Sequence, residues 1–152
     1  MFKLSYKITQ MKTFFYIILA LLATHTAALS QDLQVDSLGF ETFEMTEGDT
    51  TYVMKKYFMA FLKKGPKRDQ PATEAAEIQN GHLTYMNQLA DENKLSIAGP
   101  FGDDGEFQGI VIYNVPTLEE ATRLVNNDPA VIAGRLSIEV HPWWAAKGST
   151  LD

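Results

Sequence analysis

The sequence predicts an α+β domain whose strands and helices follow the order β-α-β-β-α-β. Two observations support this prediction: residues 72–93 and 116–128 have helical composition and spacing, and short apolar segments precede, separate and follow them. This order is typical of the ferredoxin-like fold, in which two helices lie on one face of a four-stranded antiparallel sheet. A chain of 152 residues can bury one such core, and it is too short for two.

The first predicted strand is centred on Tyr57–Leu62 and is apolar on both faces. Tyr57, Met59 and Phe61 alternate there with Phe58, Ala60 and Leu62. The segment 107–115, FQGIVIYNV, has the same character. A strand that is apolar on both faces belongs in a sheet covered on both faces, but two helices cover only one. We therefore expect a homodimer in which a second copy packs against the other face.

The remaining elements have their own local signals. The segment 94–100, KLSIAGP, predicts a short strand after the first helix. In the second helix, Thr117 and Glu120 have the spacing of a capping box, and an apolar stripe follows them. The closing strand, GRLSIEVHPWW at 134–144, places Leu136, Ile138 and Val140 on one face.

The N-terminus has the features of a secretory signal peptide. Lys3, Lys7 and Lys12 precede the apolar run 13–23, and small residues follow it. The run is shorter than the roughly 20 residues that a membrane-spanning helix needs. We expect residues 1–30 to be removed, by a cut before Gln31 or after Ala28, and the mature protein to be periplasmic or extracellular, without a membrane anchor.

The expected domain boundaries follow from composition. Residues 31–50 are acidic and lack sustained periodicity, so we interpret them as a linker or a loosely docked arm. The domain is expected over 51–146, followed by a C-terminal tail at 147–152. Cleavage after residue 30 would remove three lysines and no acid, and would change the net charge from −6 to −9.

Composition excludes several kinds of partner and chemistry. The acidic net charge and the lack of a long Lys/Arg cluster argue against nucleic acid as a partner. The chain has no cysteine, so neither thiol catalysis nor cysteine-ligated zinc applies. His82 and His141 have no metal-ligand spacing, and there is no phosphate-binding loop. We expect no metal and no cofactor.

His82 lies on the apolar stripe of the first predicted helix, which directs it towards the sheet. The stripe consists of Ala75, Ile78, His82, Met86 and Leu89. One interpretation is an interior histidine bonded to a backbone carbonyl. The other is a general acid/base, because free imidazole titrates near neutral pH. Gly81 weakens the helix by about 1 kcal/mol relative to alanine, and would allow close backbone approach or leave room for a ligand.

Three other segments have ordinary structural interpretations. Asp128 followed by Pro129 is typical of a helix N-cap with proline at the first helical position. Gly99-Pro100 is a turn after a strand. The adjacent Trp143 and Trp144 are typical of dimer contacts or of packing against the N-terminal arm.

Taken together, three stretches resemble the YCII-related family. They are FLKKGP, then GHLTYMNQLADENKLSIAGPF, then VPTLEEATRLVNNDPAVIAGRLSIEVHPWW, in this order. The resemblance implies a dimeric α+β barrel with a His82–Asp128 pair at a pocket that Gly99 and Pro100 border. Some members of the family carry an arginine three residues before the histidine, whereas this chain has Gln79 there.

These observations lead to one functional hypothesis and two rivals. We expect an exported homodimer that acts on a small organic molecule by proton transfer, as in isomerisation or elimination, with His82 and Asp128 as the acid/base pair. Apolar walls would come from Tyr85, Phe101, Trp143 and Trp144. The rivals are a non-catalytic ligand-binding or interaction module of the same fold, and a fold in which the histidine is only structural.

Overall fold

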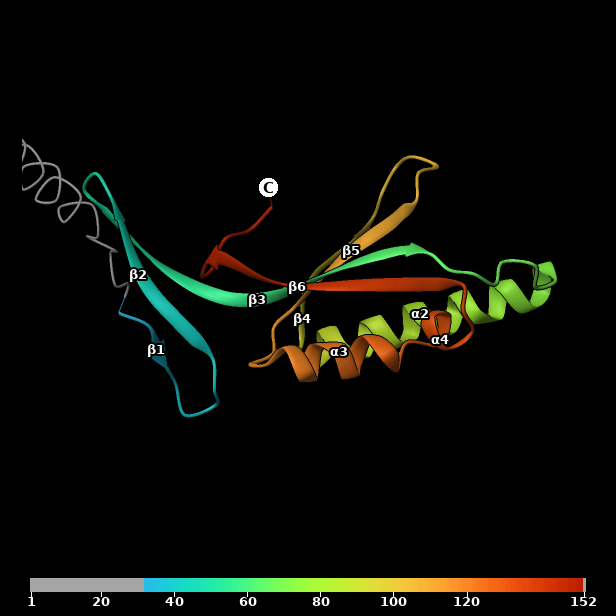
Figure 1. The fold of residues 1–152 in the computed structure, drawn as a ribbon, viewed down its shortest axis with the longest axis horizontal. Helices are drawn as coiled ribbons and strands as arrows, with labels where there is room; N and C mark the ends of the chain where they lie inside the picture. Colours follow the sequence, from blue (N-terminus) through green and yellow to red (C-terminus); the bar gives the residue numbers. More distant parts are fainter. Residues whose placement is uncertain (1–31, 152) are drawn as a thin grey trace, which may run out of the picture. The chain divides into compact units, whose positions relative to one another are not determined.

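The computed structural model describes residues 32–151, which form an antiparallel sheet with helices packed against it (Figure 1). The predicted α+β class is confirmed, because every strand pairing is antiparallel. The elements in chain order are β1 Gln34–Val35, β2 Glu41–Glu47, β3 Thr50–Lys64, α2 Ala72–Asp91, β4 Leu95–Pro100, β5 Phe107–Tyr113, α3 Leu118–Asn126, α4 Pro129–Ile132 and β6 Leu136–Ala146.

Strand β3 organises the sheet. It pairs with β6 along most of its length, and its C-terminal half pairs with β5, which in turn pairs with β4. The strand order β6-β3-β5-β4 is therefore that of the predicted ferredoxin-like arrangement. Leu62 lies opposite both Ile138 of β6 and Gly109 of β5, so the three strands are in register near the end of β3.

The core lies between this sheet and the helices α2 and α3, which lie on the same side of it (Figure 1). Strand β3 contributes Phe58, Ala60 and Leu62 to the core, as its alternation predicts. The other buried members are Met86, Leu89, Val111, Tyr113, Val115, Ala121, Leu124 and Val125. The predicted core face of β6, namely Leu136, Ile138 and Val140, packs against this cluster.

The described part of the predicted arm, residues 32–50, has more secondary structure than the sequence indicates. Strand β2 pairs with the N-terminal half of β3 through a tight hairpin, where Gly48 has a φ of 60°. Phe43 of β2 is buried and packs edge-on against Trp144, with ring centroids 4.9 Å apart. The other residues of β2 are exposed or only partly buried, and they are mostly polar. Its hydrogen-bond partner β3, and not its own composition, makes it a strand.

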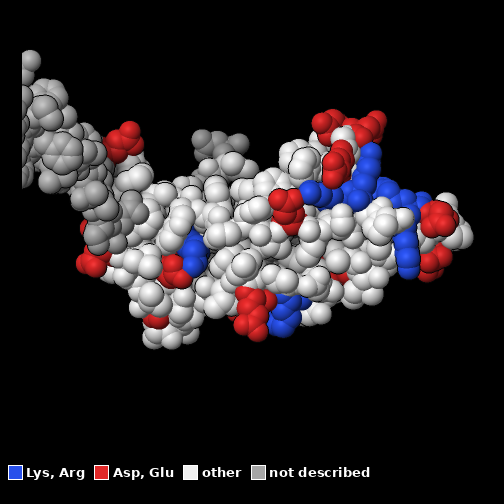
Figure 2. All heavy atoms as spheres, viewed as in Figure 1, with Lys and Arg blue, Asp and Glu red and all other residues white. Residues whose placement is uncertain are grey.

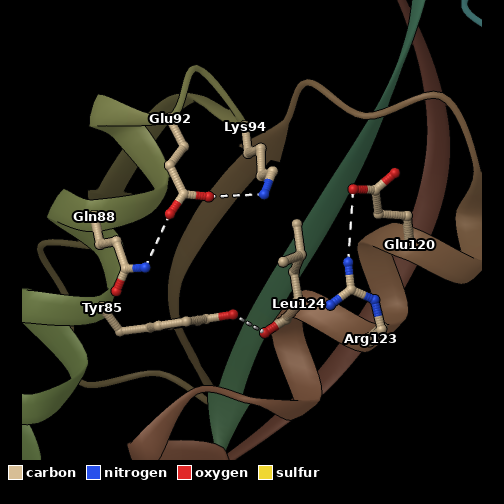
Figure 3. A network of polar contacts seen from close by, with 7 residues as sticks. All are labelled: Tyr85, Gln88, Glu92, Lys94, Glu120, Arg123 and Leu124. Atoms are coloured by element: carbon tan, nitrogen blue, oxygen red, sulfur yellow. Dashed lines mark hydrogen bonds and ion pairs between the residues drawn. The ribbon is translucent and has the colours of Figure 1, made fainter. Parts of the chain in front are cut away.

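Helices α2 and α3 match their predicted ranges and are joined by a side chain. The Tyr85 hydroxyl of α2 donates to the Leu124 carbonyl of α3 at 2.9 Å (Figure 3). At the start of α3, the Glu120 backbone N–H donates to the Thr117 hydroxyl at 3.1 Å, as the predicted cap requires. Within residues 32–151, no helix combines the length and apolarity needed to cross a membrane. The predicted signal peptide lies outside the described residues.

Candidate functional site

His82 occupies the core-facing side of α2. The histidine is 9% exposed, and it lies one turn before the buried Met86 on the same apolar stripe. A buried polar ring needs a hydrogen-bond partner, because leaving it without one would cost roughly 1–3 kcal/mol. That partner comes from α4, a distant part of the chain.

Asp128 supplies the partner and also caps α4. Its Oδ1 accepts from the Ala130 backbone N–H at 2.8 Å, and its Oδ2 lies 2.6 Å from Nδ1 of His82. Asp128 is 1% exposed. The helix-cap interpretation is thus confirmed, and the same carboxylate also contacts the histidine. The interior histidine is bonded to a carboxylate rather than to a backbone carbonyl.

The position of the ring proton depends on the state of Asp128. An ionised carboxylate can only accept, so opposite an ionised Asp128 the Nδ1 of His82 carries the hydrogen that lies between the two side chains. The other nitrogen, Nε2, then remains for exchange with another group. Because the Ala130 N–H holds the carboxylate from the opposite side, the imidazole is fixed in both tautomer and orientation.

His82 lines a cavity of about 490 Å³ between α2 and the sheet. This volume falls within the range of about 300–1,000 Å³ that is typical of small-molecule sites. Apolar side chains from several elements form part of the wall, among them Leu62, Met86, Val111 and Leu136. Gly99 and Pro100 line the cavity at the end of β4, as the resemblance implies.

The four residues predicted as apolar walls lie elsewhere in the described chain, and Trp144 among them packs against Phe43 of β2. Tyr85 points to α3, where its hydroxyl bonds the Leu124 carbonyl (Figure 3). Phe101 is 44% exposed at the end of β4 and contacts Phe107. Trp143 lies near Tyr57, on the sheet face opposite the helices. Tyr85 does not reach the cavity because it lies beside the apolar stripe of α2 rather than on it. Phe101 lies at the edge of the sheet, and Trp143 lies on the sheet face opposite the helices.

The buried phenol of Tyr113 and the partly buried phenol of Tyr85 lie close to the pair. Burial raises the pKa of Tyr85, and the charge of Asp128 raises it further. Burial and the same charge also raise the pKa of Tyr113. Both phenols therefore stay protonated well above neutral pH.

The cavity also contains polar groups that the sequence analysis did not select. Arg68 and Arg135 line it, together with the amides of Gln79, Asn87 and Gln108. The two arginines come from the β3–α2 and α4–β6 connections, where a single charged residue gives no periodic signal. Within residues 32–151, no three His, Cys, Asp or Glu side chains gather closely enough to hold a metal ion.

Comparisons with known proteins agree with the resemblance. The family model for the YCII-related domain matches residues 57–144. YjpA, an uncharacterized protein of Bacillus subtilis (strain 168), is 30% identical over 63 residues, which are 41% of this chain and 72% of YjpA.

A solved structure gives a weaker likeness. It is 5-chloro-2-hydroxyhydroquinone dehydrochlorinase (TftG) from Burkholderia phenoliruptrix AC1100, in complex with 2,5-dihydroxybenzoquinone. The TM-score is 0.43 with 24% sequence identity, over 57% of this chain and 92% of that chain. The match of the family model over more than half of the sequence, together with the YjpA alignment, shows that this chain belongs to the YCII-related family.

Proposed function

We propose that this protein is an enzyme that moves a proton on a small organic molecule, in an isomerase-like or lyase-like reaction. The observation that supports this proposal is the 2.6 Å contact between His82 Nδ1 and Asp128 Oδ2 at the wall of a cavity of ligand size. A histidine serving only the core would need no opening beside its ring.

The proposed chemistry follows from the tautomer. Nε2 of His82 removes a proton from a carbon next to an electron-withdrawing group. The imidazolium that forms is stabilised by the Asp128 carboxylate, which lies on the other side of the ring. The same Nε2–H then returns the proton to another atom of the substrate or to a leaving group, so that one residue acts first as base and then as acid.

Hydrogen–deuterium exchange tests this step directly, because it requires only that a proton be removed and a deuteron returned. The purified protein is incubated in D₂O with a panel of small neutral and acidic carbonyl compounds that carry acidic C–H bonds. Loss of the C–H signal is followed by proton NMR. We expect catalysed exchange for at least one compound, and we expect His82→Ala to abolish it. Removal of a general base typically lowers the rate by about 10²–10⁴-fold.

His141→Ala is the matched control, because His141 is exposed and bonds Glu139 on β6, away from the cavity. This variant should exchange at the wild-type rate. Equal exchange in wild type and His82→Ala would contradict the proposal. Compounds that bind beside His82 without any exchange would favour the non-catalytic ligand-binding module.

We also propose that the working form is a homodimer paired through the sheet face opposite the helices. Tyr57, Met59 and Phe61 alternate with the core residues of β3 and face that side. Phe61 packs against Phe107, which is 41% exposed, and Tyr57 lies near Trp143, which is 38% exposed. Exposed aromatic side chains of this kind on one sheet face are typical of a protein–protein contact.

Light scattering tests the dimer. Phe61→Lys should convert the wild-type dimer to a monomer, whereas Leu118→Lys on α3 should leave it intact. Leu118 is a fair control because it is 46% exposed and lies on a helix rather than on the aromatic surface. A monomeric wild-type protein would refute the dimer.

Export is the third part of the proposal, and it is supported by the sequence pattern of residues 1–30 alone. N-terminal sequencing of the protein purified from its native host should find a first residue at Gln31 or Leu29. A protein that still begins at Met1 or Met11 would refute export.

A further inference from the structure

The charged side chains in the cavity wall are of one sign. They are Arg68 and Arg135, and both are positive. Within residues 32–151, the side chains that line the cavity include no Asp or Glu. This is unexpected in a chain with 19 acidic and 13 basic residues.

Arg135 is held in place by several contacts. Its Nη1 donates to Oε1 of Gln70 at 2.8 Å, and the amide of Gln70 is itself fixed by a bond to the Ala133 carbonyl at 3.3 Å. The backbone N–H of Arg135 donates to the Ala130 carbonyl at 2.9 Å. Arg135 is partly buried, so its guanidinium has limited freedom before any ligand arrives.

Arg68 is tied to the same place. Its Nη1 donates to the Arg135 carbonyl at 3.1 Å, which brings the two side chains from the β3–α2 and α4–β6 connections to one side of the cavity. Figure 2 shows basic side chains gathered at the end of the molecule where β3 ends and α2 begins. Lys67 belongs to this group, because it packs over Gly134.

Neither arginine has a carboxylate partner within 4.0 Å in the part of the chain from 32 to 151, although four other Lys or Arg side chains there pair with a glutamate. A partly buried guanidinium that is positioned by an amide, and not neutralised by a carboxylate, retains its charge for a ligand. Its fork of N–H donors matches a carboxylate better than a lysine would.

We propose that the substrate of this site is a small organic carboxylate, whose anionic group binds Arg135 and Arg68 and whose apolar body contacts Leu62, Met86 and Leu136. This inference rests on the proposed function for the location of the chemistry, and it adds the chemical class of the substrate. The apolar wall selects an organic anion over an inorganic one.

Binding of benzoate tests the inference. NMR titration of the full chain compares benzoate with its neutral isostere benzamide and with inorganic phosphate. We expect benzoate to bind beside His82 more tightly than benzamide or phosphate. Arg135→Gln should weaken benzoate by about tenfold or more, because a hydrogen bond between charged groups is lost, while benzamide stays unchanged.

Two further variants keep the result unambiguous. Arg68→Gln alters an exposed residue, so it tests the charge even if Arg135→Gln fails to fold. Arg123→Gln removes an exposed arginine of α3, which pairs with Glu120 at 3.6 Å, and should bind benzoate as the wild type does.

The outcomes separate this inference from the proposed function. Benzoate that binds no better than benzamide, or equally well to wild type, Arg135→Gln and Arg68→Gln, would overturn the carboxylate assignment and leave the exchange experiment unaffected. Arginine-dependent benzoate binding without exchange would uphold the anion site and refute the proton transfer.

Discussion

Gly81 and Pro129 lie so close that a β-carbon on residue 81 would be 3.3 Å from Cβ of Pro129. The glycine beside His82 therefore serves close approach. It lets α2 rest on the first residue of α4, and the N-cap residue of α4 is Asp128. The short contact between two helices brings the carboxylate within reach of the imidazole.

The first prediction concerns this contact. Alanine in place of glycine normally stabilises a helix interior by about 1 kcal/mol. We expect Gly81→Ala to show no such gain, because the new methyl group meets Pro129 at less than ordinary contact distance. Asn80→Ala at the neighbouring exposed position should gain about 0.5 kcal/mol. Urea unfolding measures both, and a full gain in Gly81→Ala would contradict the close packing.

The second prediction separates the two roles of Asp128. Asn can still cap α4, whereas Ala cannot, so Asp128→Ala should be less stable than Asp128→Asn by about 1 kcal/mol in urea unfolding. Equal stability of the two variants would show that the cap contributes nothing.

The variant Asp128→Asn also tests the tautomer of His82. If the Asn oxygen keeps its bond to the Ala130 N–H, its NH₂ group faces Nδ1, which must then accept. The proton moves to Nε2, and the proposed base is lost while the fold is kept. Nitrogen-15 NMR of His82 should report protonated Nδ1 in the wild type and protonated Nε2 in Asp128→Asn.

The third prediction assigns Tyr85 to the fold. Tyr85→Phe should cost about 1 kcal/mol in unfolding free energy at pH 7, because it removes the bond to the Leu124 carbonyl, and should leave benzoate affinity unchanged. Tyr52→Phe, at an exposed position of β3, should cost less. Weaker benzoate binding in Tyr85→Phe would contradict this prediction and show that Tyr85 contributes to the binding site.

The pKa of Tyr85 adds a pH dependence. Burial raises this pKa, so the folded state holds the phenol proton more tightly than the unfolded state does. The corresponding stability is complete below the ordinary tyrosine pKa, about 10, and is lost as pH rises through the folded value. Phenylalanine does not titrate, so only the wild type loses this stability as pH rises above about 10. The difference in unfolding free energy between wild type and Tyr85→Phe should therefore narrow at high pH.

The fourth prediction concerns acid stability. A hydrogen bond from Lys63, with Nζ 2.5 Å from Oε2, lowers the pKa of Glu139, and a second bond from His141 lowers it further. A lowered carboxyl pKa stabilises the folded state above the usual glutamate range, and this contribution disappears as pH falls through the folded pKa. Between pH 6 and pH 3, about the range in which carboxylates titrate, wild type should lose more stability than Glu139→Gln.

Thermal unfolding across this pH range measures the effect. The difference should be small, because the ion pair is exposed to solvent. Glu44→Gln on β2, an exposed position, should follow the wild-type curve. A Glu139→Gln curve that coincides with the wild-type curve would refute the contribution of the Lys63 pair.

Local patterns in the sequence determined the element order from β3 to β6, the approximate extent of α2 and α3, the N-caps of α3 and α4, and the core face of β3. These features depend on residues within a few positions of one another, so periodicity and capping spacing record them. The stripe of α2 likewise directed His82 to the interior.

Tertiary structure decided the rest. Strand β2 exists because β3 offers it a hydrogen-bonding edge, and that partner cannot be deduced from residues 41–47 themselves. Arg68 and Arg135, 67 positions apart, come together because the connections that carry them are hydrogen-bonded to each other. His82 and Asp128, 46 positions apart, meet where α2 packs closely against α4 at Gly81 and Pro129. Contacts of this kind depend on the docking of whole elements, which no short stretch of sequence contains.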